Sequence, residues 1–184
     1  DAMHYLSENN IKLSIAGDGP LKQYLEKQSS GLRNIEFMGR LSDSYSFISH
    51  MDLLVVPSIR EPLGNICLEA GLCKVPVLAA NIDGLPEIIK DHVSGELINP
   101  TDDIVIDIPT GAMPLPEFVV DPTTQEIHAP RQINSKILAN KILQLSEDTE
   151  TLEKYSNQMY KKVIRYFSLK RYTLELDNIY QELI

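Results

Sequence analysis

Several features that would define other protein classes are scarce or absent in this sequence. It has no tryptophan, and its two cysteines lie six positions apart on one predicted helix, where Cys67 and Cys73 do not face each other. Neither a disulfide nor a metal site is therefore indicated, and two small buried thiols in a reducing compartment are the simpler interpretation. No apolar run approaches the roughly 20 residues that a membrane-spanning helix needs, and we expect no secretory signal peptide.

Basic residues are also few. The chain has 17 Lys and Arg against 26 Asp and Glu, and the resulting net charge of −9 argues against a nucleic-acid partner, because binding to a phosphate backbone requires a basic surface. The 184 residues are 43% hydrophobic and 23% charged, a composition typical of globular proteins. We therefore expect a single domain over residues 1–184 with a sizeable core.

Apolar segments typical of strands alternate with segments that have helical periodicity. The predicted strands are 11–16, 35–38, 52–58, 75–80 and 95–98, and the predicted helices between them are 20–29, 42–49, 64–73 and 85–90. This alternation predicts an α/β fold, a Rossmann-like open parallel sheet with helices on both faces. Ligands of such sheets bind beyond the carboxyl ends of the strands, where Gly17, Gly39 and Glu61 fall.

Residues 60–71, between the third strand and its helix, organise the candidate site. Gly64 and Asn65 lie near the helix N-terminus, whose free backbone N–H groups and dipole attract phosphate. Glu61 and Glu69 bracket this point, and carboxylates accept hydrogen bonds from sugar hydroxyls. The apolar neighbours of Glu69 predict a buried carboxylate that needs polar partners. The alternative for both glutamates is a solvated surface charge.

Two further loops follow predicted strands. Gly17-Asp18-Gly19-Pro20 permits a tight turn, and Pro20 suits the first position of the next helix. A dinucleotide-binding fingerprint would need a third glycine, so we reject it. After the second strand comes Gly39-Arg40-Leu41, and Ser42 is the expected N-cap of the following helix. Arg40 could stack on a nucleotide base or remain a solvated arginine, and the glycine loop could be a plain turn.

The order of these motifs resembles a known family. Two glutamates separated by seven residues, with Pro57-Ser58 before them and Ala70-Gly71 after, are similar to the donor site of the family 4 (group 1) retaining glycosyltransferases. The resemblance covers roughly residues 11–100. Its other motifs are Ala16–Pro20, Phe37–Leu41, Val75-Pro76-Val77, Gly84–Ile89 and Ser94-Gly95.

The resemblance implies the C-terminal, nucleotide-sugar-binding half of an enzyme of GT-B architecture. The N-terminal acceptor domain and the first strand of this half, whose loop carries an Arg and a Lys for the diphosphate, would be missing. The absence of these residues would account for the net negative charge of the chain, and the fragment alone would be inactive. The implied donor is a nucleoside-diphosphate sugar, for example a UDP-sugar, and no metal or other cofactor is implied.

The implied reaction transfers a hexose-type sugar to a glycan or lipid acceptor with retention, as in polysaccharide biosynthesis. Glu61 would act on the transferred sugar as the catalytic residue, and Glu69 would bind the ribose. The implied substrate-binding positions are Gly17, Gly19, Arg40, Leu41, Leu63, Gly64, Asn65, Ile66 and Glu69. The implied location is cytoplasmic, and peripheral association with the inner membrane face through the missing domain stays open.

Two other functions fit parts of the pattern. A stand-alone module could bind a nucleotide or a partner without catalysis. A nucleotide-sugar epimerase of the same two-domain architecture is a further alternative, although its glutamate spacing and loops should match less well. The sequence upstream of the chain would discriminate between these possibilities.

Residues 101–134 depart from the family pattern and carry five prolines, with Pro100 just before them. We expect an ordered insertion in which 105–108 and 117–120 pair as a β-hairpin, although the aspartates also fit a solvated face. From Asn134 onward the apolar spacing predicts helices with three apolar stripes, the last of them beginning after an N-cap at Ser168.

Overall fold

The computed structural model describes residues 1–105 and 112–183. After a short helix, strands and helices alternate as the sequence predicts. The elements are α1 (Ala2–Tyr5), β1 (Leu13–Ala16), α2 (Lys22–Gln28), β2 (Ile35–Gly39), α3 (Ser44–Ile48), β3 (Leu54–Val56), α4 (Asn65–Leu72), β4 (Val77–Ala80), α5 (Leu85–Ile88) and β5 (Glu96–Ile98). All pairings among these five strands are parallel, which confirms the predicted α/β class.

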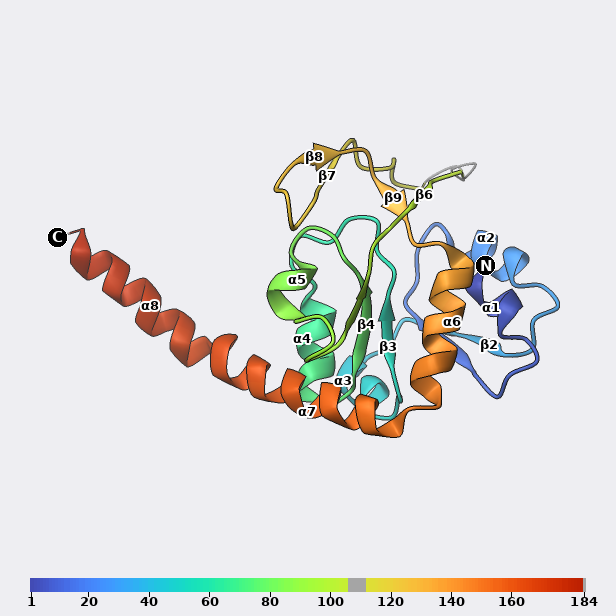
Figure 1. The fold of residues 1–184 in the computed structure, drawn as a ribbon, viewed down its shortest axis with the longest axis horizontal. Helices are drawn as coiled ribbons and strands as arrows, with labels where there is room; N and C mark the ends of the chain where they lie inside the picture. Colours follow the sequence, from blue (N-terminus) through green and yellow to red (C-terminus); the bar gives the residue numbers. More distant parts are fainter. Residues whose placement is uncertain (106–111, 184) are drawn as a thin grey trace.

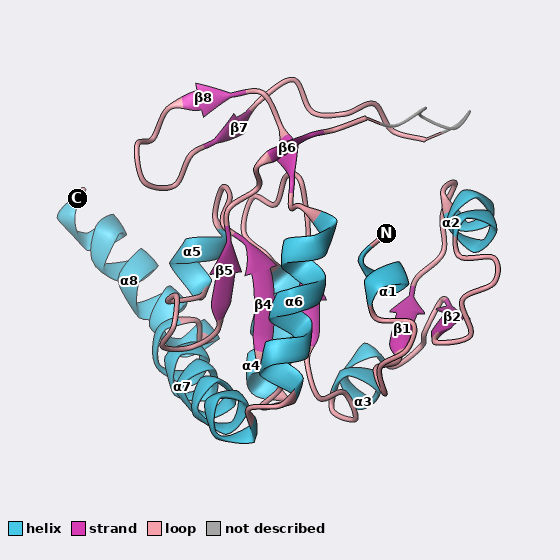
Figure 2. Ribbon diagram, turned by 45° about the vertical axis from the view of Figure 1, so that its right-hand side comes forward, coloured by secondary structure: helices cyan, strands magenta, loops and turns pink. Residues whose placement is uncertain are grey.

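The parallel strands form two separate ladders among the described residues. β1 pairs with β2, with Leu13 opposite Ile35, whereas β3, β4 and β5 pair in that order. Figure 2 shows β1 and β2 standing apart from the other three strands. The continuous open sheet expected from the sequence is therefore divided between β1 and β3, each of which has one paired edge in the described structure.

The core lies around β4, whose four residues are at most 1% exposed. α6 (Ser135–Ser146), α7 (Thr149–Tyr166) and α8 (Leu169–Glu182) follow the sheet. α7 packs against α4 and crosses its lower end in Figure 1. A Cβ atom at Gly71 would lie only 2.7 Å from a methyl carbon of Val163, so the glycine lets these two helices approach closely. None of the described helices combines the length and the apolar composition required to cross a membrane.

Side-chain caps define where several helices begin. Ser168 caps α8 as predicted, by accepting a hydrogen bond from the Arg171 N–H. The prediction of Ser42 as the cap of α3 is wrong: Asp43 holds that place and accepts from the Ser46 N–H at 2.9 Å. Likewise, α2 begins at Lys22, so Pro20 precedes the helix instead of opening it.

The insertion contains two short antiparallel ladders. β6 (Asp102–Asp103) pairs with β9 (Arg131–Gln132), and β7 (Val119–Val120) pairs with β8 (Ile127–His128). The predicted pairing of 117–120 with 105–108 is therefore wrong for its second arm, while residues 106–108 of the first arm lie outside the described residues. The ladders lie above the carboxyl ends of β4 and β5 (Figures 1 and 2).

The third predicted apolar stripe is helical but not part of the core. α8 has no buried residue, and it extends away from the rest of the chain in Figure 1. Its apolar side chains are exposed, including Leu169 at 78% and Tyr172 at 63%. The sequence thus predicts the helix and its apolar face correctly, but no described element covers that face.

Candidate functional site

The loops after β1 and β2 meet at the edge of the first ladder. The Gly17 N–H donates to the Gly39 carbonyl oxygen at 2.7 Å, and both glycines have positive φ values, 129° and 65°. A hollow of about 450 Å³ opens here, lined by Asp18, Gly19 and Arg40. The structure therefore brings together three positions that the sequence selects, Gly17, Gly19 and Arg40, and the half-buried Leu41 follows them directly.

The start of α4 forms the second part of the site. Gly64 is the N-cap residue and adopts a left-handed conformation with φ 92°, which its lack of a side chain permits. A Cβ atom there would lie 2.6 Å from Leu85 Cδ2. The N–H groups of Asn65 and Ile66 have no hydrogen-bond acceptor among the described residues, as is usual in a first helical turn. These groups can bind an anion.

Glu61 lies against the same helix N-terminus. One carboxylate oxygen, Oε1, accepts a hydrogen bond from the Gly64 N–H at 3.1 Å. A negative charge at this position is favourable because the helix dipole is positive at its N-terminus. Leu63, between the two residues, is exposed. The loop thus places a carboxylate directly beside the free N–H groups of the helix.

Glu69 lies one turn further along α4. Its Oε2 atom accepts a hydrogen bond from the Ser44 hydroxyl at 3.3 Å. The side chain is partly exposed and has a polar neighbour, so the expectation of a buried carboxylate in apolar surroundings is wrong. The reason is that α3, which packs on α4, presents its first residue at this point. Ser44 is a contact that the sequence analysis missed.

Asp83 joins the Glu61 loop to the insertion. Its Oδ2 atom accepts from the Glu61 N–H and its Oδ1 atom from the Val120 N–H, both at 2.9 Å. Asp83 has φ 42°, a conformation that aspartate tolerates better than most residues. The sequence analysis also missed this residue, although an aspartate before Gly84 in a turn after a strand could have indicated it.

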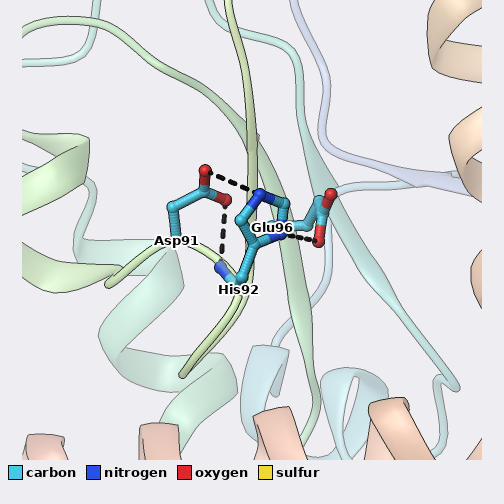
Figure 3. Close-up of side chains that lie close together, drawn as sticks. All are labelled: Asp91, His92 and Glu96. Atoms are coloured by element: carbon cyan, nitrogen blue, oxygen red, sulfur yellow. Dashed lines mark hydrogen bonds and ion pairs between the residues drawn. The ribbon is translucent and has the colours of Figure 1, made fainter.

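A third cluster of titratable groups lies at the N-terminal end of β5, which begins at Glu96. The His92 ring is placed between Asp91 and the buried Glu96 (Figure 3), with Nδ1 3.1 Å from Glu96 Oε2 and Nε2 3.4 Å from Asp91 Oδ2. Candidate ligand atoms of the three residues lie within 4.8 Å of one another. However, Lys141 Nζ lies 2.6 Å from Glu96 Oε1, and the Tyr155 hydroxyl donates to Oε2 at 2.8 Å.

These contacts make the third cluster an internal ion-pair network, because a cation would have to displace Lys141. Burial by itself raises the pKa of the Glu96 carboxyl, but hydrogen bonds from Lys141 and Tyr155, with the charges of Lys141 and His92, hold it below its ordinary value. Burial, together with the hydrogen bond to Glu96, raises the pKa of Tyr155. The network joins β5 to α6 and α7.

The thiol nearest the site is unreactive. Cys67 is fully buried, and both cysteines are free, as the sequence predicts. Burial, followed by the nearby charge of Glu61, raises the pKa of the Cys67 thiol to about 12. At neutral pH the residue is therefore protonated and is no candidate for a nucleophile.

Comparison with known proteins identifies the family to which this chain belongs. The family model described as "Glycosyl transferases group 1" matches residues 1–108, more than half of the chain. The chain therefore belongs to the group 1 glycosyltransferase family. This finding confirms that the sequence motifs are those of a group 1 glycosyltransferase.

Individual relatives show the same relationship over part of their length. The chain is 36% identical over 100 residues to the glycosyltransferase MJ1607 of Methanocaldococcus jannaschii. It is also 36% identical over 92 residues to LpsD, a lipopolysaccharide core biosynthesis glycosyltransferase of Rhizobium meliloti. These alignments cover 52% and 48% of the chain but only 26% of each relative, so the chain matches about a quarter of their length.

Solved structures share the fold. Alr3699/HepE of Anabaena, crystallised with UDP-glucose, has a TM-score of 0.73 at 21% identity, covering 99% of this chain and 43% of that one. The C-terminal domain of LpcC, a group 1 glycosyltransferase of Francisella tularensis, has a TM-score of 0.65 at 23% identity, covering 91% and 76%. The chain thus has the fold of a group 1 glycosyltransferase C-terminal domain.

Proposed function

We propose that residues 1–184 form the donor-binding domain of a retaining hexosyltransferase of GT-B architecture, with 101–134 as an insertion within it. The observation that carries the proposal is the arrangement around α4. Free N–H groups of Asn65 and Ile66 lie between two carboxylates, Glu61 at the N-terminus and Glu69 one turn on. This combination matches a ligand with phosphate in the middle and hydroxyls on both sides.

The proposed donor is a nucleoside-diphosphate sugar that lies across both ladders. The base occupies the hollow lined by Asp18, Gly19 and Arg40, where the exposed guanidinium can stack on it. Gly17 and the Leu41 backbone, which adjoin these residues in sequence, would border the base. The diphosphate lies on the first turn of α4, including Leu63 and Gly64. The solved neighbour in complex with UDP-glucose supports a UDP-sugar as the first donor to test.

In this arrangement, the carboxylate of Glu69 accepts hydrogen bonds from the ribose hydroxyls. Ser44 would fix the rotamer of Glu69, because its hydroxyl donates to one carboxylate oxygen. Glu61 leaves the Gly64 N–H and turns to hydroxyls of the transferred sugar, which orients the reacting ring. No protein nucleophile is assigned in this proposal. The leaving phosphate would act as base while the acceptor attacks from the same face.

The divided sheet fits the expectation of a missing first strand. β1 and β3 each pair with one strand only among the described residues, so a further parallel strand can join the two ladders there. We place the cations for the diphosphate in the loop after that strand. Without them and without an acceptor domain, the 184-residue chain should bind a nucleotide weakly and transfer no sugar.

The exposed face of α8 is the proposed contact with the N-terminal acceptor domain. Its apolar side chains include Leu169, Leu174 and Ile179, and none is buried in this domain. The reduced cysteines are consistent with a cytoplasmic enzyme. Transfer to a glycan or lipid, and any contact with the inner membrane face through the acceptor domain, are parts of the same proposal.

The proposal is tested by titrating the ¹⁵N-labelled chain with UDP and recording amide chemical shifts. Changes should appear at Gly19 and Arg40, in the loops after β1 and β2, and at Asn65 and Ile66, in the first turn of α4. Changes confined to other surfaces, or no binding at millimolar UDP, would contradict the assigned site. Sugar transfer by the isolated chain would contradict the division of the enzyme into two necessary halves.

A further inference from the structure

A second cavity lies between the insertion and the loop that carries Glu61. It has a volume of about 320 Å³ and is lined by Arg60, Pro62 and Glu87 and by residues 83–84, 118–120 and 125. These residues come from three segments that are distant in sequence. The volume is near the lower limit of about 300 Å³ for small-molecule sites, so the cavity has room for one small ring.

The lining groups combine an aromatic ring with hydrogen-bonding groups of both kinds. The Arg60 guanidinium lies over the Phe118 ring, 5.6 Å from its centroid, which orients its N–H donors. Glu87 supplies an acceptor, and Gln125 supplies a donor and an acceptor. Among the described residues neither Arg60 nor Glu87 has an ion-pair partner within 4 Å.

This chemistry favours a neutral hydroxylated ligand over an anion. A phosphate would gain from Arg60 but would be repelled by Glu87 and Asp83. Sugar hydroxyls both donate and accept, so they can pair with the carboxylates and with the guanidinium. The C–H face of a pyranose ring can pack on the exposed part of the Phe118 ring that Arg60 does not cover.

The insertion wall of the cavity is fixed in place. Val119 is 1% exposed and anchors β7, while the Asp83 carboxylate holds the N–H groups of Val120 and Glu61 together. The Asp83 N–H also donates to the Val120 carbonyl oxygen at 3.2 Å. The wall and the Glu61 loop therefore form one unit, and a ligand would meet a preformed site.

We propose that this cavity is a saccharide subsite that binds a neutral sugar ring of the acceptor. The acceptor role rests on the proposed function, because Arg60 and Pro62 flank Glu61, the residue that would contact the transferred sugar. Residues 118–125 lie beyond the segment that the family model matches, so this part of the chain would supply a specificity that the common fold does not.

The test is a chemical-shift titration of the ¹⁵N-labelled chain with the methyl α-pyranosides of glucose, galactose and mannose. At least one should bind at millimolar concentration and shift the amides of Gly84, Val119 and Val120. Phe118→Ala and Glu87→Gln should each weaken that binding roughly tenfold or more. Ile127→Ala is the matched control, because Ile127 is 66% exposed on the same insertion and does not line the cavity.

Several results would overturn the subsite. These are the absence of shifts at the three amides with all glycosides, an equal effect of Ile127→Ala and Phe118→Ala, or shifts with inorganic phosphate alone. A parallel UDP titration separates this proposal from the donor site. UDP binding without glycoside binding overturns the subsite alone. Glycoside binding without UDP binding supports a saccharide site and contradicts the proposed donor function.

Discussion

Asp83 and Val120 are joined through both backbone groups of Val120. The Asp83 carboxylate accepts from the Val120 N–H at 2.9 Å, and the Asp83 N–H donates to the Val120 carbonyl oxygen at 3.2 Å. Because the other carboxylate oxygen accepts from the Glu61 N–H, one side chain fixes the insertion and the candidate catalytic loop together.

Asp83→Ala should therefore loosen both segments at once. Hydrogen bonds to a charged acceptor contribute about 1.5–3 kcal/mol each. We expect the amides of Glu61 and Val120 to exchange with solvent roughly tenfold faster or more in hydrogen-exchange measurements. Asp103→Ala is the control, because that side chain is 88% exposed and should leave both amides unchanged. Unchanged protection in Asp83→Ala would show that other contacts hold the insertion.

Gly84 should tolerate no side chain. A Cβ atom there would lie 2.0 Å from the Pro62 carbonyl oxygen, a backbone atom that cannot move without shifting the Glu61 loop. Gly84→Ala should lower the free energy of unfolding by roughly 3 kcal/mol or more. Gly19→Ala should have little effect, because a Cβ atom at that position would have no atom within 4 Å apart from those of its chain neighbours. Thermal denaturation of both variants gives the comparison, and equal losses would refute the steric explanation.

The Glu96 network predicts a specific loss of stability in acid. The folded-state pKa of Glu96 is lowered, so its contribution is present above the unfolded-state pKa of about 4.3 and is lost as pH falls through the folded-state value. Glu96→Gln should lower the free energy of unfolding at neutral pH. It should also make the fall in that free energy below about pH 5 less steep. Glu126→Gln, at an exposed position, is the control. If the free energies of unfolding of wild type and Glu96→Gln fell in parallel as the pH was lowered, Glu96 would not have this role.

Removing the Lys141 cation from the same network should lower the free energy of unfolding. Lys141 Nζ lies 2.6 Å from Glu96 Oε1, and the carboxylate is almost completely buried whereas Lys141 keeps a quarter of its side chain exposed. Lys141→Met should destabilise the chain by roughly 2–4 kcal/mol, less than the loss of a partner from a fully buried pair. Lys136→Met on the exposed surface of α6 is the control. Urea denaturation measures both, and similar midpoints would contradict the prediction.

Local patterns predicted most of the strands and helices correctly. The apolar runs around Val55 and Leu78 and the helical spacing after Asn134 contain enough information in short windows to identify each element. The glycine loops and the glutamate spacing likewise placed the candidate residues at strand ends and on α4. These features depend on neighbours in sequence, which a single sequence displays directly.

Features that depend on distant partners were not predicted. Val119 and Val120 have the composition of a strand, but composition does not show that they pair with 127–128 instead of 105–108. Ser42 and Asp43 are both good N-caps, and only the backbone decides between them. The contacts of Ser44 with Glu69 and of Asp83 with Val120 join residues 25 and 37 positions apart.

The different roles of Glu61 and Glu69 provide the most direct test of the proposed donor site. The measurement is calorimetric titration of wild type, Glu61→Ala and Glu69→Ala with UDP and with UDP-glucose. Glu69→Ala should weaken UDP binding roughly ten- to a hundredfold, because two hydrogen bonds from ribose to a charged acceptor are lost. Glu61→Ala should leave UDP affinity nearly unchanged and weaken UDP-glucose only. Equal effects of the two substitutions on UDP binding would contradict the account.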